Sequence, residues 1–387
     1  MYSLEVALEI GLNVAGRRGA DAYIHGLLGG LAAAGPSHRF HVFSYFFRDY
    51  AEKLRKLQLP AAPNVVNQVR RWPQSLVDRL EWGVGLPVCA ALFARPGRFH
   101  LYHGLSPRLP RLFGMRSVAT VHDLIYEVFA ERGLEPFRGS SIRQAVERAD
   151  RVICISRSTR DDLFRFYGTP PEKVRVIPYG LDHSRLRPAG GQEMALARTR
   201  YMLREPYFLL LGPFEYRRNH ERVLRAIADL RREGLCAGYR LVCLGAKTSY
   251  WGKLTALAGQ LGLADDFIGL GHVPWEDLPA IYGMAAALVH PTIYEGFGLP
   301  VLEAMACGAP VISSNTSSIP EVAGDAALLV DPESVEAIGG ALRDLVTRPE
   351  LGPALRAAGL ERAKSFSWRR AAEQTLEVYK ELCPPAS

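Results

Sequence analysis

Short runs of β-branched and other apolar residues alternate along the chain with segments whose apolar residues recur at helical spacing. This alternation is typical of βαβ units, in which helices connect parallel strands. It restricts the chain to α/β folds with open, mostly parallel sheets. Because 387 residues exceed one typical core, we expect two domains of roughly 150 to 200 residues each.

The predicted strands form two series, one in each half of the chain. Those of the first half are expected at Val6–Leu12, Arg39–Phe43, Leu101–His103, Ser117–Val121, Arg151–Ile155 and Arg175–Ile177. Those of the second half are expected at Tyr207–Leu211, Tyr239–Leu244, Phe267–Leu270, Ala287–His290, Pro310–Ser313 and Ala327–Val330. The predicted fold class is α/β, with two doubly wound, Rossmann-like domains that face each other across a cleft at the carboxyl ends of their strands.

The domain boundary is expected in the segment 178–206, which is rich in glycine, proline and charge. We therefore predict an N-terminal domain over 1–185 and a C-terminal domain over 186–367. The final predicted helix, about 368–382, carries apolar residues at helical spacing on one face. That face is expected to pack back onto the N-terminal domain.

Composition indicates an ordinary globular protein, because 48% of the residues are apolar and 22% are charged. The six cysteines are scattered without a CxxC pair, which favours a reducing cytoplasm. No signal peptide is evident. The longest uncharged stretch, 82–94, is interrupted by glycines and Pro87 and is too short to span a bilayer, so we expect no transmembrane helix.

Positive charge is concentrated in the first half of the chain. Residues 1–190 hold 27 Lys/Arg and 17 Asp/Glu, a net charge of +10, whereas residues 191–387 hold 20 and 23, a net charge of −3. The excess, with the arginine- and tryptophan-containing stretch 70–82, fits either an anionic membrane surface or an arginine-rich genome. Nucleic acid is not expected as a partner, and the protein is expected in the cytoplasm or peripherally at the inner membrane.

A nicotinamide enzyme is disfavoured because no GxGxxG follows the first predicted strand. The glycines of the segment 26–30 lie inside a helical pattern and have the wrong spacing for a dinucleotide-binding turn.

The most informative motif covers residues 294–308, YEGFGLPVLEAMACG, and follows a predicted strand. Pro300 suits a first helical turn and Gly308 suits a helix C-terminus. The backbone N–H groups of 296–299 would then face a ligand at the positive end of the helix, where a phosphate fits. Glu295 and Glu303 can accept hydrogen bonds from hydroxyls on different parts of one extended ligand, or they are simply a loop charge and a solvated helix residue.

The stretch EGFGLPVLEA resembles the glutamate-x7-glutamate motif of the family 4 retaining glycosyltransferases, which have the GT-B fold. The resemblance extends over 264–332. It implies that the hexose hydroxyls are held by Glu295 and the backbone of Gly296, Phe297, Gly298 and Leu299. It also implies that Glu303 holds the nucleotide ribose and that the backbone around His272 and Val273 meets the base.

A second donor element is expected in the segment 212–219, GPFEYRRN, between a strand and an amphipathic helix. Two arginines at a helix N-terminus, Arg217 and Arg218, can clamp a diphosphate, although in isolation such a pair is more often solvated. Asn219 is expected to cap the helix. The segment resembles the arginine-lysine-asparagine motif of the family, with Arg218 in place of the lysine.

Two elements of the first half also resemble the family. The segment 15–23 resembles the glycine-rich loop that approaches the β-phosphate, but only Gly19 aligns well, and an ordinary turn is the alternative. His122 and Asp123 end a strand and resemble the histidine-aspartate segment, which implies that His122 contacts the donor sugar and that Asp123 fixes the loop or the imidazole. His103 ends the preceding strand and is expected on the acceptor side.

No Asp-x-Asp and no Cys/His cluster with metal-ligand spacing occurs in the sequence, so we expect no essential metal and no cofactor besides the donor. The leaving diphosphate would be neutralised by arginines, helix N-termini and backbone donors. We identify no carboxylate suited to a double displacement. The resemblance implies a front-face route in which the departing phosphate accepts the acceptor's proton, with His122 and Glu295 as the catalytic residues.

These observations predict a retaining, metal-independent hexosyltransferase that uses a nucleotide-diphosphate sugar. By resemblance, a mannose-type donor and a glycan or lipid-linked acceptor of bacterial surface polysaccharide or glycolipid synthesis are favoured. The alternative enzymes are a GT-B epimerase or phosphorylase, and the alternative from another class is a non-catalytic sugar-nucleotide-binding partner. The presence of Arg218, Glu295, Glu303 and His122 together favours an active transferase.

Overall fold

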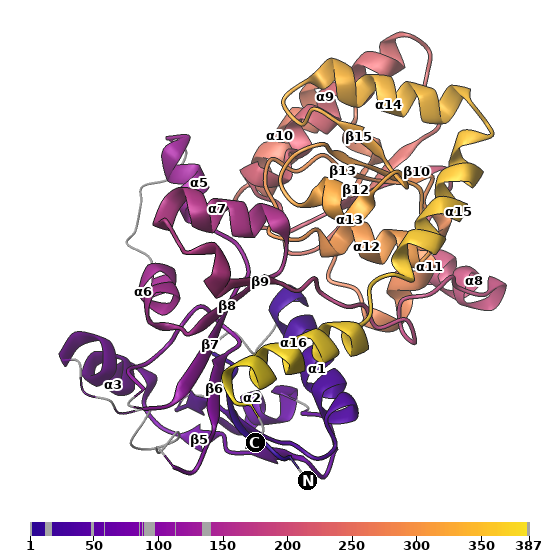
Figure 1. Ribbon diagram of the computed structural model, residues 1–387. Helices are drawn as coiled ribbons and strands as arrows, with labels where there is room; N and C mark the ends of the chain where they lie inside the picture. The colour runs from indigo at the N-terminus through magenta and orange to yellow at the C-terminus, as the bar shows by residue number, and fades with distance from the viewer. Residues whose placement is uncertain are drawn as a thin grey trace. The chain divides into compact units, whose positions relative to one another are not determined.

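The computed structural model describes residues 2–11, 18–47, 50–57, 59–84, 86, 88, 97–112, 114–133 and 141–384 (Figure 1). The chain divides into two compact units: unit 1 is Met1–Gly180 with Ser367–Ser387, and unit 2 is Leu181–Phe366. The boundaries predicted from the sequence lie after residues 185 and 367. Within the described part of the chain, no helix has the length and hydropathy needed to cross a bilayer.

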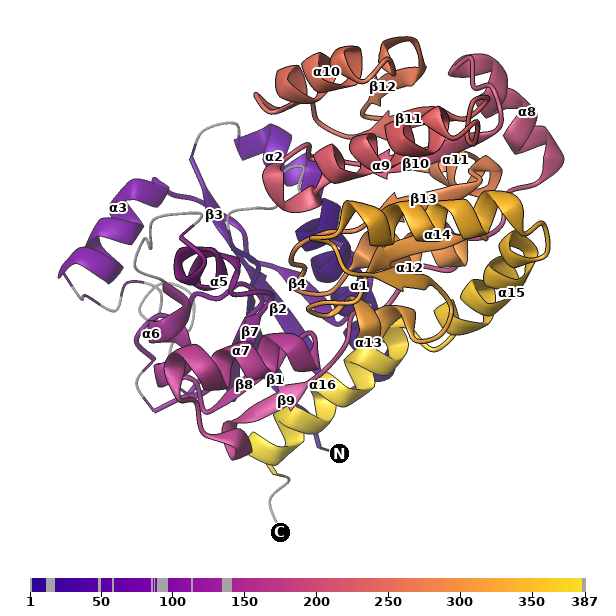
Figure 2. The ribbon, with the colours of Figure 1, turned by 90° about the horizontal axis from the view of Figure 1, so that it is seen from above.

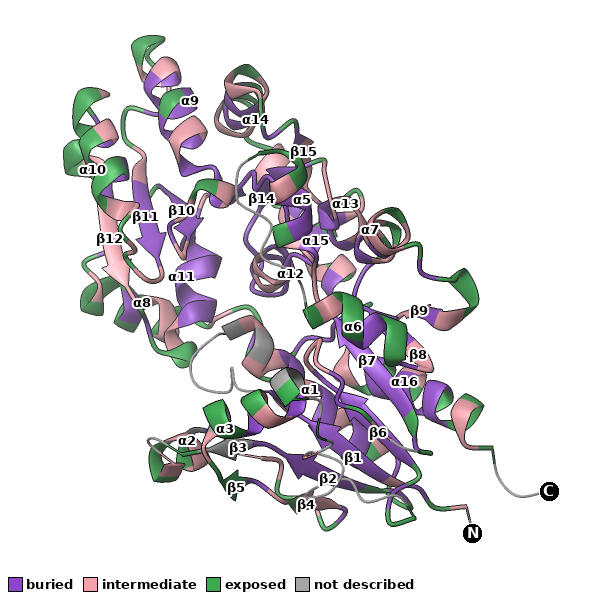
Figure 3. Cartoon of the chain, turned by 90° about the vertical axis from the view of Figure 1, so that its left-hand side faces the viewer, coloured by how far each residue is buried: buried purple, intermediate pink, exposed green. Residues whose placement is uncertain are grey.

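Unit 1 is built on a parallel seven-stranded sheet with the order β4-β2-β1-β6-β7-β8-β9. Its strands are β1 (Glu5–Glu9), β2 (Arg39–Phe43), β4 (Val65–Asn67), β6 (Leu101–Gly104), β7 (Arg116–Val121), β8 (Arg151–Cys154) and β9 (Val174–Val176). A separate two-stranded sheet pairs β3 (Tyr45–Phe46) with β5 (Arg70–Arg71). The central strands are buried, as Figure 3 shows, so their near-continuous apolar runs follow from burial on both faces.

The helices of unit 1 connect these strands and cover the sheet. They are α1 (Arg18–Ala34), α2 (Tyr50–Leu57), α3 (Gln74–Asp78), the π-helix η1 (Arg79–Val84), α5 (Ile125–Glu131), α6 (Ser141–Arg148), α7 (Arg157–Tyr167), the 3-10 helix η2 (Pro171–Lys173) and α16 (Trp368–Leu382).

The C-terminal helix α16 packs along α1 (Figures 1 and 2). Glycines allow this close approach, because a Cβ atom on Gly26 would lie 2.0 Å from Cε2 of Trp368 and one on Gly30 would lie 2.5 Å from the Trp368 carbonyl oxygen. Ser367 caps the helix by accepting a hydrogen bond from the backbone N–H of Arg370. The glycines within the helical pattern of α1 therefore serve helix packing.

Unit 2 contains a parallel six-stranded sheet with the order β12-β11-β10-β13-β14-β15. Its strands are β10 (Tyr207–Leu211), β11 (Arg240–Leu244), β12 (Phe267–Gly271), β13 (Ala287–His290), β14 (Val311–Ser314) and β15 (Leu328–Val330). Its helices are α8 (Gly191–Arg200), η3 (Tyr216–Arg218), α9 (His220–Arg232), α10 (Trp251–Gln260), η4 (Ala264–Asp266), η5 (Trp275–Asp277), α11 (Leu278–Met284), α12 (Leu299–Ala306), α13 (Ile319–Ala323), α14 (Val335–Thr347) and α15 (Leu351–Ala363).

One apolar core of unit 2 joins α9, α10 and α14 to the sheet. Val223 and Ile227 of α9, Leu254 of α10 and Ile338 of α14 are fully buried in the same cluster as Phe208 of β10. The amphipathic spacing in α9 thus places one face of that helix on the sheet and leaves its N-terminus near the end of β10.

The α/β prediction with two Rossmann-like parallel sheets is confirmed. The predicted first strand is too long, because β1 ends at Glu9 and Gly11 adopts a left-handed φ of 70°; Leu12 lies outside the described residues. The short strands β3, β4 and β5 were not predicted, since two or three residues give no readable alternation.

Candidate active site

In unit 2, the strand order reverses between β10 and β13, which are adjacent although the chain visits β11 and β12 between them. Ligands of open α/β sheets bind outside the carboxyl ends of the strands at such a switch point. The segment after β10 carries Arg217 and Arg218, and the segment after β13 carries Glu295. The two predicted donor motifs therefore meet at this point.

The two loops are held together by backbone and side-chain hydrogen bonds. The Ile293 N–H donates to the Arg217 carbonyl at 2.8 Å, and Asn219 Nδ2 donates to the carbonyls of Pro291 and Pro332. Asn219 occupies the N-cap position of α9 with a left-handed φ of 63°, but its side chain makes no capping bond. The predicted N-cap is therefore wrong. The side-chain NH2 group of Asn219 connects the loops instead, and its Oδ1 accepts a hydrogen bond from Nη1 of Arg222 at 2.8 Å.

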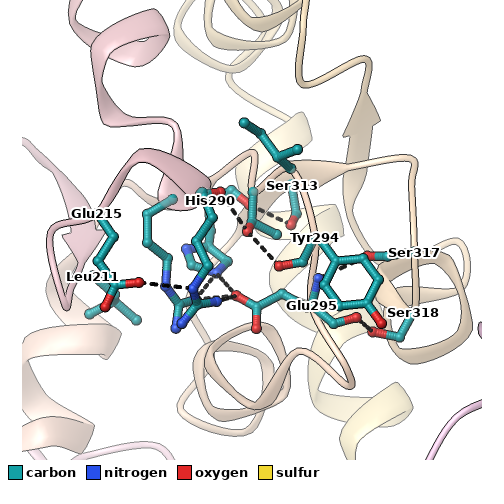
Figure 4. A network of polar contacts seen from close by, with 12 residues as sticks. Leu211, Glu215, His290, Tyr294, Glu295, Ser313, Ser317 and Ser318 are labelled. Carbon is teal, nitrogen blue, oxygen red and sulfur yellow. Dashed lines mark hydrogen bonds and ion pairs between the residues drawn. The ribbon is translucent and has the colours of Figure 1, made fainter. Parts of the chain in front are cut away.

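Arg217, Arg218 and Glu295 form an ion cluster in which Arg218 and Glu295 are buried and Arg217 is partly buried. Figure 4 labels Glu295 and its neighbours Glu215 and His290. Nη1 of Arg218 donates to Oε1 of Glu295, and Nη1 of Arg217 lies 3.4 Å from the same oxygen. Nε of Arg217 also donates to Oε2 of Glu215 at 3.1 Å. His290 completes the cluster, with its Nε2 2.7 Å from Nη1 of Arg218 and 3.3 Å from Oε1 of Glu295.

The cluster keeps Glu295 ionised. Burial raises the pKa of the Glu295 carboxyl, but the charges of Arg218 and Arg217 outweigh burial and hold that pKa well below its usual range. Burial also lowers the pKa of the Arg218 guanidinium. Residues predicted to bind the sugar and the diphosphate are thus paired with one another in the structure.

His290 is a site residue that sequence reasoning missed. It ends β13 and is almost completely buried, and its carbonyl accepts a hydrogen bond from Ser313 Oγ at 2.7 Å. Burial lowers the pKa of its imidazole, so the ring is neutral near pH 7. Its position five residues before Glu295 was the available signal, but a strand-end histidine is also common as a structural residue.

Two serines hold the backbone of the loop that contains Glu295 in place. The Glu295 N–H donates to Ser317 Oγ at 3.1 Å, and Ser318 Oγ donates to the Glu295 carbonyl at 2.8 Å (Figure 4). Gly298 has a φ of 105°, which disfavours other residues, and α12 starts at Leu299. The predicted strand-loop-helix arrangement is therefore present, with Gly296 and Phe297 in the loop.

The remaining predicted donor residues of unit 2 lie on neighbouring elements. Glu303 is on α12, and its Oε2 accepts a hydrogen bond from the Tyr282 hydroxyl at 3.0 Å. His272 and Val273 follow β12, with the His272 side chain exposed and Val273 buried. The contact predicted between the backbone of these two residues and the nucleotide base stays a prediction.

In unit 1, His122 and Asp123 follow the end of β7. The His122 ring is half-buried, and its Nε2 donates to the Leu105 carbonyl at 2.8 Å while its Nδ1 accepts from the Tyr179 hydroxyl at 2.6 Å. Burial lowers the pKa of His122. Asp123 Oδ1 accepts from the Ile125 N–H at 3.2 Å, so Asp123 holds the loop after the strand.

His103 does not lie on an acceptor-facing surface. The side chain is fully buried, its Nδ1 contacts the Tyr379 hydroxyl at 2.6 Å, and its Nε2 contacts Thr120 Oγ1 at 2.8 Å. Tyr23 contacts the same Thr120 oxygen at 2.9 Å. The physical reason is that α16 returns to cover this strand end, and both ring nitrogens serve to join α16 to the sheet.

Glu9 is a second residue that sequence reasoning missed. It ends β1 beside β6, where the strand order of unit 1 reverses. The buried carboxylate accepts hydrogen bonds from the Gly11 N–H at 2.9 Å and from Ser106 Oγ at 3.1 Å. Burial raises the pKa of Glu9 to about 6, although Arg108 acts in the opposite direction. A titratable group at a switch point is a candidate functional residue.

Gly19 is the second residue of α1, and the predicted loop residues 15–17 lie outside the described part of the chain. Among the described residues, no group of three or more His, Cys, Asp or Glu side chains is arranged to hold a metal ion.

Two family models match the chain. Residues 17–185 match the model described as Glycosyltransferase Family 4, and residues 198–362 match the model described as Glycosyl transferases group 1. The matches correspond to unit 1 and unit 2, and both candidate site loops of unit 2 lie within the second match.

Relatives and solved structures agree with these matches. The O-antigen chain mannosyltransferase B of Escherichia coli is 32% identical over 292 residues, which cover 73% of this chain and 74% of that protein. A sucrose-phosphate synthase structure from Thermosynechococcus elongatus has a TM-score of 0.77 at 23% identity, covering 99% of this chain and 100% of that one. The Anabaena Alr3699/HepE complex with UDP-glucose has a TM-score of 0.74 at 16% identity, covering 98% and 100%. The fold is GT-B, and the chain belongs to the group 1 glycosyltransferases of family 4.

Proposed function

We propose that the protein is a retaining hexosyltransferase that uses a nucleotide-diphosphate sugar as donor and requires neither a metal ion nor a further cofactor. The observation that carries this proposal is the ion cluster of Arg217, Arg218 and Glu295 at the switch point of unit 2. It combines two fixed cations with a carboxylate, which are the groups needed for a diphosphate and for sugar hydroxyls.

The two arginines are the groups that would bind the donor diphosphate. A guanidinium presents paired N–H donors that match phosphate oxygens, and burial strengthens the attraction by lowering the local dielectric. Glu295 and the backbone of 296–299 would then hold the hexose, and Glu303 would hold the ribose. Electrostatic stabilisation of this kind acts most strongly on the charge that develops on the leaving group.

Retention of the anomeric configuration is proposed to follow a front-face route. The glycosidic oxygen of the departing diphosphate accepts the proton of the acceptor hydroxyl, and that hydroxyl attacks from the same face of the sugar. Nδ1 of His122 accepts from the Tyr179 hydroxyl, which leaves the proton on Nε2, where it is donated to the Leu105 carbonyl. His122 would therefore contact a sugar hydroxyl as a neutral donor, and not as a base, by exchanging the Leu105 carbonyl for that hydroxyl.

The proposed sugar is mannose or a similar hexose, and the proposed acceptor is a glycan or lipid-linked saccharide of a surface polysaccharide or glycolipid. Support comes from the similarity to the Escherichia coli O-antigen chain mannosyltransferase B. A cytoplasmic enzyme at the inner membrane fits this acceptor, and the group 1 match favours a transferase over an epimerase, a phosphorylase or a non-catalytic partner.

A surface of unit 1 suits peripheral membrane binding. Arg70, Arg71 and Trp72 are exposed in and after β5, and the Arg71 guanidinium lies 5.5 Å from the ring centroid of the exposed Phe47. We call Phe47, Arg70, Arg71 and Trp72 the β5 surface. Exposed aromatic and basic side chains in one place favour the headgroup region of an anionic bilayer.

A donor panel tests the proposed function. The purified chain is incubated with GDP-mannose, UDP-glucose and dTDP-rhamnose and an acceptor extract, and nucleoside diphosphate release is measured. We expect one donor to be consumed and the new linkage to have the donor's anomeric configuration by NMR. Inversion of the configuration would refute retention, and inertness of all three donors would refute the proposed hexose-transfer activity.

A further inference from the structure

The ring nitrogen Nε2 of His290 has two neighbours, of which one is a hydrogen-bond donor and the other an acceptor. Nη1 of Arg218, 2.7 Å away, is a hydrogen-bond donor and requires a lone pair on Nε2. Oε1 of Glu295, 3.3 Å away, is an acceptor and requires a proton on Nε2. A single nitrogen satisfies one of these partners at a time. The shorter distance favours the arginine, which leaves the proton on Nδ1.

The other ring nitrogen gives no compensation. Within the described part of the chain, Nδ1 of His290 is buried and has no hydrogen-bond partner, and the same is true of Nε of Arg218. An unsatisfied buried polar atom is costly, so its persistence in a binding site requires an explanation. Nδ1 carries a proton both in this neutral ring and in the imidazolium, so the partners of His290 can change only at Nε2.

The charges of the cluster change when a diphosphate enters. In the structure, Arg217 and Arg218 form ion pairs with Glu215 and Glu295. If the arginines turn to a diphosphate, Glu215 can be hydrated because 44% of its side chain is exposed. Glu295, at 11%, cannot be hydrated to the same degree and must find donors inside the protein.

We propose that His290 is a positioning residue that exchanges partners when the donor binds. As Arg218 turns to the diphosphate, Nε2 of His290 takes up one proton from solvent and donates it to Oε1 of Glu295. The resulting imidazolium replaces the lost guanidinium and keeps the carboxylate aimed at the sugar. The proton returns to solvent when the nucleoside diphosphate leaves. This inference rests on the proposed function.

The surroundings of His290 are consistent with this exchange. The groups that face it are Arg217 and Arg218 from η3, Glu295 from the loop after β13 and the neutral His220 from α9. Burial and the two arginines lower the pKa of His290, whereas Glu295 raises it. Neutralisation of the arginines by a diphosphate leaves Glu295 as the dominant neighbour, and its charge favours the protonated ring.

Isothermal titration calorimetry tests the exchange. GDP-mannose, UDP-glucose and dTDP-rhamnose are each titrated near neutral pH in buffers with different ionisation enthalpies. The diphosphate of a nucleotide sugar is esterified at both ends and has no ionisation in this range, so proton uptake reports on the protein. We expect uptake of about one proton per bound donor, and donor affinity that falls as the pH rises.

Variants assign the proton to His290. An asparagine at this position can donate a hydrogen bond but cannot be protonated, so His290→Asn should abolish the proton uptake. Donor binding should weaken on the order of tenfold, because a charge-assisted hydrogen bond to Glu295 is lost. The pH dependence of the donor KM should flatten, with a smaller effect on kcat. His183→Asn is the matched control, because His183 lies in the same unit and donates to the Phe366 carbonyl.

The outcomes separate this inference from the proposed function. Donor binding by the wild type without proton uptake, or uptake that persists in His290→Asn, would overturn the exchange and leave the transferase proposal standing. Absence of binding for all three nucleotide sugars would overturn the proposed function and the exchange with it.

Discussion

Nη1 of Arg218 donates to Oε1 of Glu295 in a site where the two residues are only 7% and 9% exposed. Burying such a pair is expensive, and well-packed apolar residues are often at least as stable. Stability alone therefore gives no reason to retain the pair. A ligand that carries both an anion and hydroxyl groups does give a reason, because each member of the pair then has its own partner in the complex.

Removal of the Glu295 charge should impair catalysis. In Glu295→Gln the amide oxygen still accepts from Arg218, but the anion is lost, so kcat/KM should fall by about a hundredfold, roughly 3 kcal/mol of transition-state stabilisation. Steady-state kinetics with the consumed donor measure this loss. Near wild-type turnover in Glu295→Gln would show that the donor assignment of this loop is wrong.

Glu295→Ala should also lower stability, which distinguishes it from the glutamine variant. It leaves the Arg218 guanidinium buried without its nearest anion, a loss of about 3 to 5 kcal/mol in comparable buried pairs. Urea denaturation gives the free energy of unfolding. Equal stability of the alanine variant and the wild type would mean that Arg218 reaches water when Glu295 is absent.

Catalysis should be insensitive to chelators. The expectation rests on Arg217 and Arg218, whose two positive charges can take up the charge of a leaving diphosphate. Nucleoside diphosphate release is measured after dialysis against EDTA and after addition of magnesium or manganese. Complete loss in EDTA with recovery on addition of either metal would contradict the arginine clamp.

Gly26 should be intolerant of a side chain because of Trp368. A Cβ atom at Gly26 would lie 2.0 Å from the indole, so Gly26→Ala should destabilise unit 1 by about 1 to 3 kcal/mol through overpacking. Gly29 on the same helix has no atom within 4 Å of its Cβ position. Gly29→Ala is the control and should stabilise α1 by up to about 1 kcal/mol. Thermal denaturation should separate the two variants.

The sequence predicted the sheets well because their central strands are long apolar runs. Three strands, Arg39–Phe43, Tyr207–Leu211 and Ala287–His290, have the predicted bounds, as does the final helix. The strand Val65–Asn67 was missed because three residues at a sheet edge carry no periodicity. The end of β1 was placed too late because the turn at Gly11 depends on a backbone angle.

The local structure of the candidate site was predicted where one continuous segment carries the turn and helix signals, as in the loop and helix of residues 294–308. Partners distant in sequence were not predictable. The pairing of Arg218 with Glu295 joins residues 77 positions apart, and the burial of His103 depends on Tyr379, which is 276 positions away. Tertiary contacts of this kind decide which polar side chains face a ligand and which face the interior.

The β5 surface should bind anionic vesicles. Each basic residue near an anionic bilayer contributes roughly 1 kcal/mol, so the double variant Arg70→Ala, Arg71→Ala should lose roughly 2 kcal/mol of binding. Sedimentation with phosphatidylglycerol vesicles at low and high salt measures the partitioning, which should weaken with salt.

The matched control for the β5 surface is Arg232→Ala with Arg348→Ala, which removes the same charge from exposed positions of unit 2. That variant should partition like the wild type. If the wild-type protein stays in the supernatant with anionic vesicles at low salt, the membrane proposal fails and a water-soluble acceptor takes its place.

Glu9 should make stability depend on pH. Burial raises its pKa from 4.5 to about 6, so its favourable contribution is fully present below pH 4.5 and is lost as the pH rises through about 6. The loss amounts to about 2 kcal/mol, since one pKa unit corresponds to about 1.4 kcal/mol.

The glutamine side chain of Glu9→Gln cannot titrate. The free energy of unfolding of this variant, relative to that of the wild type, should therefore rise by about 2 kcal/mol between pH 4.5 and 7. A Glu361→Gln control at an exposed position should show no such gain. A pH-independent difference between Glu9→Gln and the wild type would mean that the Gly11 and Ser106 hydrogen bonds fully offset the burial of the carboxylate.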